Sequence, residues 1–468
     1  MNRNRIASWL SSLPSSGWLP VTVLLVATAI VGPSLGGISR PLFVAGCLAT
    51  GVLAWKRDPA THVQSAIILF AFAPFVRRLV DVSAGFDQSS IMLIGPLLFI
   101  LAPLPDLWRM LAARQFNSWL IFPVIILACV GYGASLSMFQ GDWMIAANGA
   151  VKWASPVIYA IALQQKADSR GDLVNAAAGA FLAVLPLTGL YGIWQYVDPP
   201  TWDRYWMTYA SITSAGYPMP YMVRVFSTMN GPASYATFTA TGLLLVGFLR
   251  PGWQSLLVMS PAALGLLLSL YRTSWLALAL AILFCMVFQA TRKRALTTAL
   301  GIAGAAVAAI LFTPFGEVIT DRLESLGGGS EDGSGAERLE EFVTLWNAPD
   351  SMVLGNGFTV GDVGSAGTMP IDGQIVASWN TLGIPVGLIF LTAYISVALW
   401  ATSSAWRRPT REGVVLGALA FSAIVIQMPL TSIASGEVSA LFWMLAAMAC
   451  PIEETVALRT SLQPQQAE

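Results

Sequence analysis

The sequence has few of the residues on which soluble enzymes usually rely. It contains one histidine, His62, and only 11% of its residues are charged, against about 25% in an average soluble domain. It shows no P-loop, no zinc-binding motif and no Ser-His-Asp set. Gly355, Gly357 and Gly361 do not have the spacing of a dinucleotide-binding loop. We therefore expect no cofactor, no metal ion and no nucleic-acid partner.

Cysteine is also scarce, since Cys47, Cys129, Cys285 and Cys450 are the only ones. Each lies in or at the end of an apolar segment, and together they lack the spacing of metal ligands. We expect them to be small buried hydrophobic residues.

Apolar residues dominate the chain instead. The sequence is 56% hydrophobic, its mean hydropathy is +0.66, and apolar runs recur near the ~20 residues that a membrane-crossing helix needs. The basic N-terminus leads into the first run without a clear cleavage site, so that run is predicted to be an uncleaved span. The fourteen candidate spans are 18–34, 41–55, 62–76, 89–104, 118–138, 150–165, 173–196, 231–249, 254–270, 272–290, 295–315, 376–401, 413–430 and 437–452. Residues 1–468 are thus predicted to form one all-α, polytopic membrane domain with about 14 transmembrane helices.

The distribution of Lys and Arg predicts the orientation of these spans. With the N-terminus in the cytoplasm, 16 of the 25 basic residues fall in cytoplasmic loops and at the ends of the chain, as the positive-inside rule requires. Both termini are then cytoplasmic. Two long polar stretches, 197–230 and 316–372, become extracytoplasmic loops. In a bacterium this places the protein in the inner membrane, with these loops in the periplasm.

Several arginines on the outer side oppose the orienting rule. Arg77 and Arg78 close the third predicted span, Arg224 precedes the eighth, Arg272 separates the ninth and tenth, and Arg338 lies in the longer loop. A single arginine there fits snorkelling to lipid headgroups. Basic groups that converge at the membrane edge instead indicate a functional site, and we predict that these side chains bind substrate.

The shorter outer loop is rich in aromatic residues, among them Trp202, Tyr205 and Trp206. Flat aromatic faces suit stacking on sugar rings, and we predict that these three hold substrate. The alternative is an interfacial aromatic belt, which membrane proteins commonly have.

The longer outer loop is the longest interruption of the apolar pattern. Gly327–Ser330 reads as a flexible link, and 336–347 has the spacing of a short amphipathic helix that carries Arg338 near its start. Asp372 precedes the next apolar run.

The outer residues suggest a type of chemistry. Guanidinium groups match phosphate oxygens and stabilise charge on a leaving group, while a carboxylate can accept a proton from an attacking hydroxyl. The pattern favours chemistry on a lipid-linked pyrophosphate, with Arg272, Arg338 and Asp372 as catalytic residues and Arg224, Arg77 and Arg78 as phosphate contacts.

Four segments carry a family resemblance. They are Arg224–Ala236 (RVFSTMNGPASYA), Leu268–Trp275 (LSLYRTSW), Arg338–Phe358, which ends in LGNGF, and Asp372–Pro385, which ends in LGIP. In order, spacing and outer placement they resemble motifs of the O-antigen polymerase/ligase superfamily, which includes Wzy-type polysaccharide polymerases and O-antigen ligases. The resemblance covers roughly residues 60–450.

The resemblance implies a GT-C-like helical fold and a metal-independent, inverting glycosyl transfer from an undecaprenyl-diphosphate-linked donor. An acceptor glycan, membrane lipids and a chain-length regulator or export machinery would be partners. Ligases of the family carry a histidine where this chain has Asp372, which favours a polymerase of exopolysaccharide, capsule or O-antigen repeat units. The alternatives are a ligase that transfers finished polymer to a lipid or protein, and a transporter or flippase of lipid-linked oligosaccharides.

Overall fold

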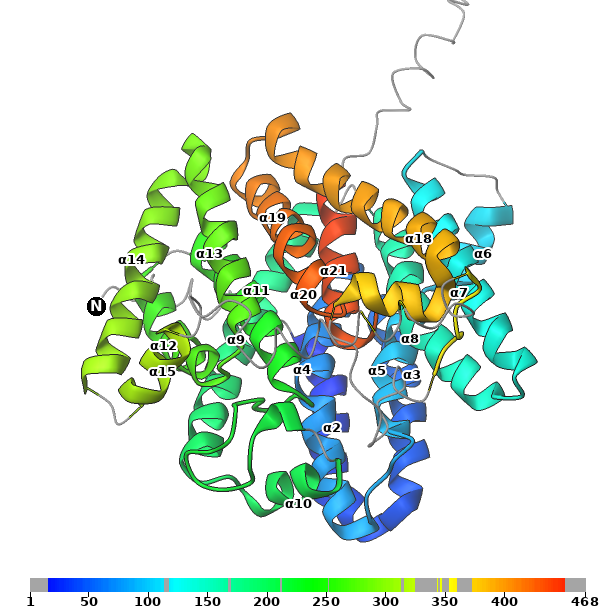
Figure 1. Cartoon of the computed structure of the whole chain (residues 1–468), viewed down its shortest axis with the longest axis horizontal. Helices are drawn as coiled ribbons and strands as arrows, with labels where there is room; N and C mark the ends of the chain where they lie inside the picture. The colour runs from blue at the N-terminus through cyan, green and yellow to red at the C-terminus, as the bar shows by residue number, and fades with distance from the viewer. Residues whose placement is uncertain are drawn as a thin grey trace, which may run out of the picture.

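A computed structural model describes residues 16–112, 118–166, 170–210, 213–250, 252–312, 315–324, 343, 346, 353–359 and 373–450. Within these residues the secondary structure between the turns and loops is helical, apart from one isolated bridge between Gly216 and Val223. The all-α prediction is therefore confirmed for the described part of the chain (Figure 1). Each of the fourteen predicted spans overlaps a helix.

The α-helices follow one another along the chain, and the longest described connection is the segment 213–231 before α11. In order they are α2 (Leu19–Leu35), α3 (Ser39–Arg57), α4 (Pro59–Ala84), α5 (Ile94–Ile100), α6 (Leu104–Ala112), α7 (Ile121–Phe139), α8 (Trp143–Gln164), α9 (Arg170–Val197), α10 (Thr201–Ala210), α11 (Pro232–Leu249), α12 (Trp253–Leu268), α13 (Arg272–Val287), α14 (Gln289–Phe312), α15 (Gly316–Glu324), α18 (Gln374–Arg407), α19 (Arg411–Ser422), α20 (Met428–Leu430) and α21 (Gly436–Ala449). A π-helical turn, Ala423–Gln427, joins α19 to α20.

Eight helical stretches in the described residues are long and apolar enough to cross a membrane, counting Leu19–Arg57 as one stretch. Three further apolar helices, α12, α13 and α21, are shorter, and so is the stretch Ile91–Ile100. The structure thus has the helices of a membrane-embedded protein. Fourteen separate crossings stay a prediction.

The helices divide into an inner group and an outer group. Most of α4, α9 and α11 is buried, whereas α2, α3 and α14 are mainly exposed. Many exposed side chains of the outer group are apolar, as Ile30 at 73% and Leu311 at 68% illustrate. Hydrocarbon is as apolar as these side chains, so lipid contact explains why such surfaces are stable on a membrane protein.

The helix α18 has a kink where two of the sequence motifs meet. Gly383 leaves the helical conformation with φ +72°. The backbone of Gly355 fills the space beside it, since a Cβ on Gly355 would lie 2.4 Å from the Gly383 nitrogen. Asn356 N and Gly357 N then donate to the carbonyls of Asn380 (2.7 Å) and Thr381 (3.0 Å). The two glycines thus allow the 353–359 segment to dock onto α18.

The cysteines and the histidine complete the core. All four cysteines are buried and free, as the sequence predicts. His62 lies in α4 with its side chain fully buried. Its ring stacks on Phe99 at 4.5 Å, and its Nδ1 lies 2.9 Å from the Tyr159 hydroxyl. The aromatic surroundings between α4, α5 and α8 satisfy the ring without solvent.

Candidate functional site

The segment between α10 and α11 holds Arg224 in a fixed place. Its backbone crosses the end of the bundle, where Arg224 N donates to Ala215 O (2.9 Å) and Val225 N donates to Leu268 O (3.1 Å). The Oε1 atom of Gln195 accepts from Phe226 N and Ser227 N, at 3.1 and 2.7 Å. The neighbours of Arg224 on both sides are buried, whereas Arg224 itself is only half-buried. Among the described residues, its guanidinium group forms no ion pair and no hydrogen bond.

Arg272 is the first residue of α13. A cation at a helix N-terminus opposes the helix dipole, whereas an anion there is stabilised. The residue before it, Tyr271, contacts the Thr431 hydroxyl through its own hydroxyl. Arg272 is therefore fixed between the turn that joins α12 to α13 and the loop that precedes α21.

Arg322 joins these two residues from α15. The helix docks through Phe315 and Ile319, which are buried, and Arg322 Nε donates to Leu270 O at 3.2 Å. Burial, together with repulsion from Arg224 and Arg272, lowers the pKa of Arg322 to about 10. The three guanidinium groups thus lie close enough for their charges to interact, and we call Arg224, Arg272 and Arg322 the arginine cluster.

The sequence pattern placed Arg322 in the outer loop without assigning it a role. A local signal for α15 exists, since Glu317 stands in its first turn and Arg322 in its last turn, the arrangement that complements a helix dipole. The amphipathic pattern of 336–347 is stronger, and for this reason the sequence interpretation did not predict α15. That predicted helix and Arg338 lie outside the described residues, apart from residues 343 and 346.

Three residues with strained backbone angles lie close in sequence to the cluster. Tyr221, Ser227 and Leu270 have positive φ angles of 62°, 51° and 53°. Such angles are unfavourable for bulky side chains, which makes Tyr221 and Leu270 the most unusual. Strained residues of this kind are held in place by their surroundings and concentrate at functional sites. Each of the three lies within three residues of Arg224 or Arg272.

The exit of the longer loop lies near the same place. Asp372 is outside the described residues, but Gly373 approaches the carbonyl of Pro429. The Oε1 atom of Gln374 accepts from Ile433 N and Ala434 N, at 2.9 and 2.8 Å. Because Thr431 of this same loop contacts Tyr271, the residue that follows Asp372 is connected to Arg272 through a short chain of contacts.

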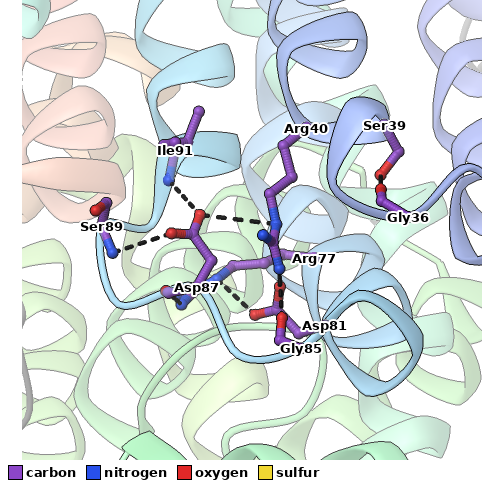
Figure 2. A network of polar contacts seen from close by, with 9 residues as sticks. All are labelled: Gly36, Ser39, Arg40, Arg77, Asp81, Gly85, Asp87, Ser89 and Ile91. Atoms are coloured by element: carbon purple, nitrogen blue, oxygen red, sulfur yellow. Dashed lines mark hydrogen bonds and ion pairs between the residues drawn. The ribbon is translucent and has the colours of Figure 1, made fainter.

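Arg77 differs from the cluster because its surroundings, drawn in Figure 2, include carboxylates. Its side chain is buried, its Nε lies 3.2 Å from Asp81 Oδ2, and its Nη2 donates to Asp87 O at 2.6 Å. Arg40 completes the network with Nη2 at 2.9 Å from Asp81 Oδ1. Asp87 also accepts from the backbone at the start of the next helical turn. These contacts occupy Arg77, which corrects its predicted role as a phosphate contact.

Arg78 is likewise committed to the protein interior. It is fully buried and pairs with Asp203 of α10, with 3.2 Å between Nε and Oδ1. Its Nη1 and Nη2 donate to the carbonyls of Met229 (3.0 Å) and Ser227 (2.6 Å). Burial raises the pKa of Asp203, and the charge of Arg78 opposes that rise. Arg78 therefore joins α4, α10 and the Arg224 segment, and no part of it is left for a substrate.

The three aromatic side chains predicted to hold sugars have different environments. Trp206 is buried and packs on Phe226 at 5.3 Å, which removes it from the substrate-binding candidates. Trp202 is half-buried and donates to the Tyr191 hydroxyl at 2.7 Å. Tyr205 is half-buried beside Tyr209, with 4.5 Å between ring centroids. Only the last two retain surface for a ligand.

Comparison with known proteins adds no identity to this geometry. The chain matches no known family model and no curated protein. The site must therefore be interpreted from its own residues. Among the described residues, no three His, Cys, Asp or Glu side chains are placed to hold a metal ion. The cluster has three positively charged side chains at one end of an apolar helix bundle. This arrangement suits an anion that is attached to a lipid.

Proposed function

We propose that the protein is a membrane glycosyltransferase that polymerises undecaprenyl-diphosphate-linked oligosaccharide repeat units. The observation that carries the proposal is the arginine cluster, in which α13, α15 and the segment before α11 bring three guanidinium groups together. A partly buried Arg322 that is repelled by both Arg224 and Arg272 favours a ligand of high negative charge. A diphosphate at the edge of the membrane has that charge.

The proposed reaction joins two glycans with inversion at the anomeric carbon. A hydroxyl oxygen of the acceptor sugar attacks the anomeric carbon of the donor, and the bond from that carbon to the diphosphate oxygen breaks. The bonding pair leaves with the diphosphate, where the arginine cluster stabilises the new charge. Asp372 takes the proton of the attacking hydroxyl as general base. Arg338 stays a proposed further contact of the leaving group.

The proposal includes an arrangement in the membrane. Fourteen crossings with both termini in the cytoplasm place the cluster and both outer loops in the periplasm of a bacterium. The fold would be GT-C-like, and the acceptor would be the non-reducing end of another lipid-linked repeat unit. A chain-length regulator or export machinery would act with the enzyme.

Gene replacement tests this proposal. In cells that lack the native protein, Arg272→Ala should abolish long polymer while single lipid-linked repeat units accumulate. Arg204→Ala is a matched control, because Arg204 is an outer-side arginine that pairs with Asp198 on an exposed surface. Purified protein should convert defined lipid-linked repeat units into longer chains. Normal chain lengths in the Arg272→Ala strain, at normal protein level, would contradict the site assignment.

Two alternative functions predict different cell phenotypes. A ligase would leave finished polymer on the carrier lipid when the gene is deleted, because only the final transfer is lost. A flippase would leave repeat units on the cytoplasmic leaflet. The replacement of a family histidine by Asp372 favours the polymerase over the ligase, and the gathering of strong charge at one end of the bundle favours it over a flippase, which needs polar groups near the membrane midplane.

A further inference from the structure

The segment 216–223 forms a small hairpin, which we call the outer hairpin, next to α10 in the lower part of Figure 1. A bridge joins Gly216 to Val223, and Tyr217 N donates to Met222 O at 3.1 Å. Its tip is apolar and exposed, with Tyr217 at 67% and Tyr221 at 51%. An exposed apolar tip on the polar side of a membrane protein is unfavourable unless it has a ligand or partner.

The outer hairpin is held in one conformation. Pro218 and Pro220 restrict its backbone, and Tyr221 has a strained φ of 62°. Tyr221 N donates to Tyr196 O at 2.8 Å. The ring of Tyr196 also meets the Tyr221 ring edge-on at 5.8 Å. A fixed aromatic surface loses little conformational entropy when a ligand binds, which favours recognition.

Two connections join the outer hairpin to the arginine cluster. Along the chain, Arg224 directly follows the hairpin, and its backbone bonds to Ala215 at the start of the opposite arm. Through space, Tyr196 contacts Tyr221 on one side and Phe315 on the other, at 5.8 and 5.3 Å. Phe315 directly precedes α15, which carries Arg322. A polymer bound on the hairpin would therefore extend toward the cluster.

The chemistry of the hairpin limits what it can bind. From residue 205 to residue 223 the sequence has no charged residue, so the surface offers no charge complementarity to an acidic or basic protein partner. Tyrosine offers an apolar ring face together with a hydroxyl that donates and accepts hydrogen bonds. Sugar rings present the same combination, with C–H groups on one face and hydroxyls at the edge.

We propose that the outer hairpin is a glycan-binding surface on which Tyr217 and Tyr221 stack against sugar rings. It holds the glycan next to the arginine cluster and so rests on the proposed function for its role in catalysis. It also replaces the buried Trp206 as the aromatic contact of the sugar. The binding itself does not depend on any reaction, and this allows a separate test.

Saturation-transfer NMR on the full chain in lipid nanodiscs tests the proposal. The probe is a set of oligosaccharides cut from the surface polysaccharide of the cells that express the protein. Wild-type protein should transfer saturation to the sugar C–H protons, and Tyr217→Ala with Tyr221→Ala should weaken binding at least tenfold. Replacing both tyrosines with tryptophan should preserve binding, which separates ring stacking from a loss of folding. Phe139→Ala with Trp143→Ala is the control, because these residues are 90% and 66% exposed at the turn between α7 and α8.

Other occupants give distinct results. A nitroxide on Tyr217→Cys should be more accessible to a water-soluble nickel complex than to oxygen. The reverse order would show a lipid-inserted tip, and broadening by a label on a second copy would show self-association; either result overturns the proposal. So does unchanged glycan binding in the double alanine variant, or no binding by wild-type protein. If the hairpin binds glycan but purified protein makes no polymer, the proposed polymerase function fails while the hairpin assignment stands.

Discussion

Two groups of arginines in this molecule differ in what surrounds them, although both lie on the predicted outer side. Arg40, Arg77 and Arg78 face the carboxylates of Asp81, Asp87 and Asp203 in nearly dry surroundings. In the arginine cluster the neighbours of each guanidinium group include other guanidinium groups. In the first group, carboxylates balance the positive charges, and the ion pairs join helices. The second group concentrates positive charge where part of it remains exposed.

Position relative to the membrane therefore does not by itself identify a functional arginine. Both groups oppose the positive-inside rule in the predicted topology. A buried arginine with a carboxylate partner is retained because removal of either member leaves an uncompensated charge. A half-buried arginine beside other arginines has the features expected of an anion-binding residue. Variants of the two groups test that distinction, beginning with the largest expected effect.

Arg78→Ala should have the largest effect on stability. The change leaves the buried Asp203 without its cation and the carbonyl of Met229 without its donor, while Ser227 O keeps only a 3.4 Å bond from Gln195 Nε2. Breaking a buried ion pair costs about 3–5 kcal/mol, so unfolding in detergent micelles should shift to clearly lower denaturant. Arg204→Ala serves as the exposed control, with an expected change of about 0–1 kcal/mol. An unchanged midpoint with weaker binding of pyrophosphate would move Arg78 into the functional group.

Arg272→Ala should have the opposite profile. Loss of a group that stabilises the leaving diphosphate should lower the polymerisation rate about 10²–10³-fold, while the unfolding midpoint stays near that of the wild type. The measurement is the rate with purified protein and lipid-linked repeat units, together with the midpoint of the same preparation. A rate loss that follows only from unfolding would make Arg272 a structural residue like Arg78.

Arg322→Ala should reduce affinity for the ligand without reducing stability. Burial and the neighbouring arginines lower the pKa of Arg322 to about 10, below its value in an unfolded chain. Its positive charge therefore destabilises the folded state at neutral pH, and the relief of that repulsion offsets the loss of its hydrogen bond to Leu270 O. We expect inorganic pyrophosphate to bind about tenfold more weakly, or about 1.4 kcal/mol, and the unfolding midpoint to be no lower. The affinity difference should shrink at high salt, and a salt-independent difference would argue against a charge effect.

Tyr271→Phe should have the smallest effect. It removes the contact between the Tyr271 and Thr431 hydroxyls, and a hydrogen bond of this kind contributes about 1 kcal/mol. We expect a fall of a few-fold in rate, because the turn that carries Arg272 is less firmly joined to the loop beside Gln374. Thr431→Val is the partner variant. If the two changes act through one contact, the double variant should resemble either single variant rather than their sum.

The sequence pattern predicted the helices well because the hydrophobic run is a local signal. Each predicted span overlaps a helix, the polar stretches between them hold Arg224 and Arg322, and Arg272 begins the predicted span 272–290. Side-chain burial depends on distant partners and was not predictable in the same way. Arg78 and Arg224 are both arginines next to predicted spans, and they differ because Arg78 packs against Asp203 and the carbonyls of Ser227 and Met229. Trp206 likewise points inward because α10 forms where the pattern showed only a polar, aromatic-rich loop.

The structure also explains why two of the sequence motifs occur together, which their spacing in the chain did not show. LGNGF and LGIP lie far apart in the chain, yet Gly355 and Gly383 face each other at the kink of α18. Neither position has room for a Cβ, so the two motifs depend on each other. The resemblance had treated them as separate elements of a pattern.

This docking has a consequence for how such a protein can change over evolutionary time. One end of the longer loop is fastened by α15 and the other by the 353–359 segment and Gln374. The entropy of closing a loop rises only slowly with its length. The chain between these attachments can therefore change in length at little cost in closure entropy, provided that the contact of Trp346 with Trp379 is kept. Changes in its length can adapt the protein to different glycans, while Arg338 and the residues that position the arginine cluster stay under constraint.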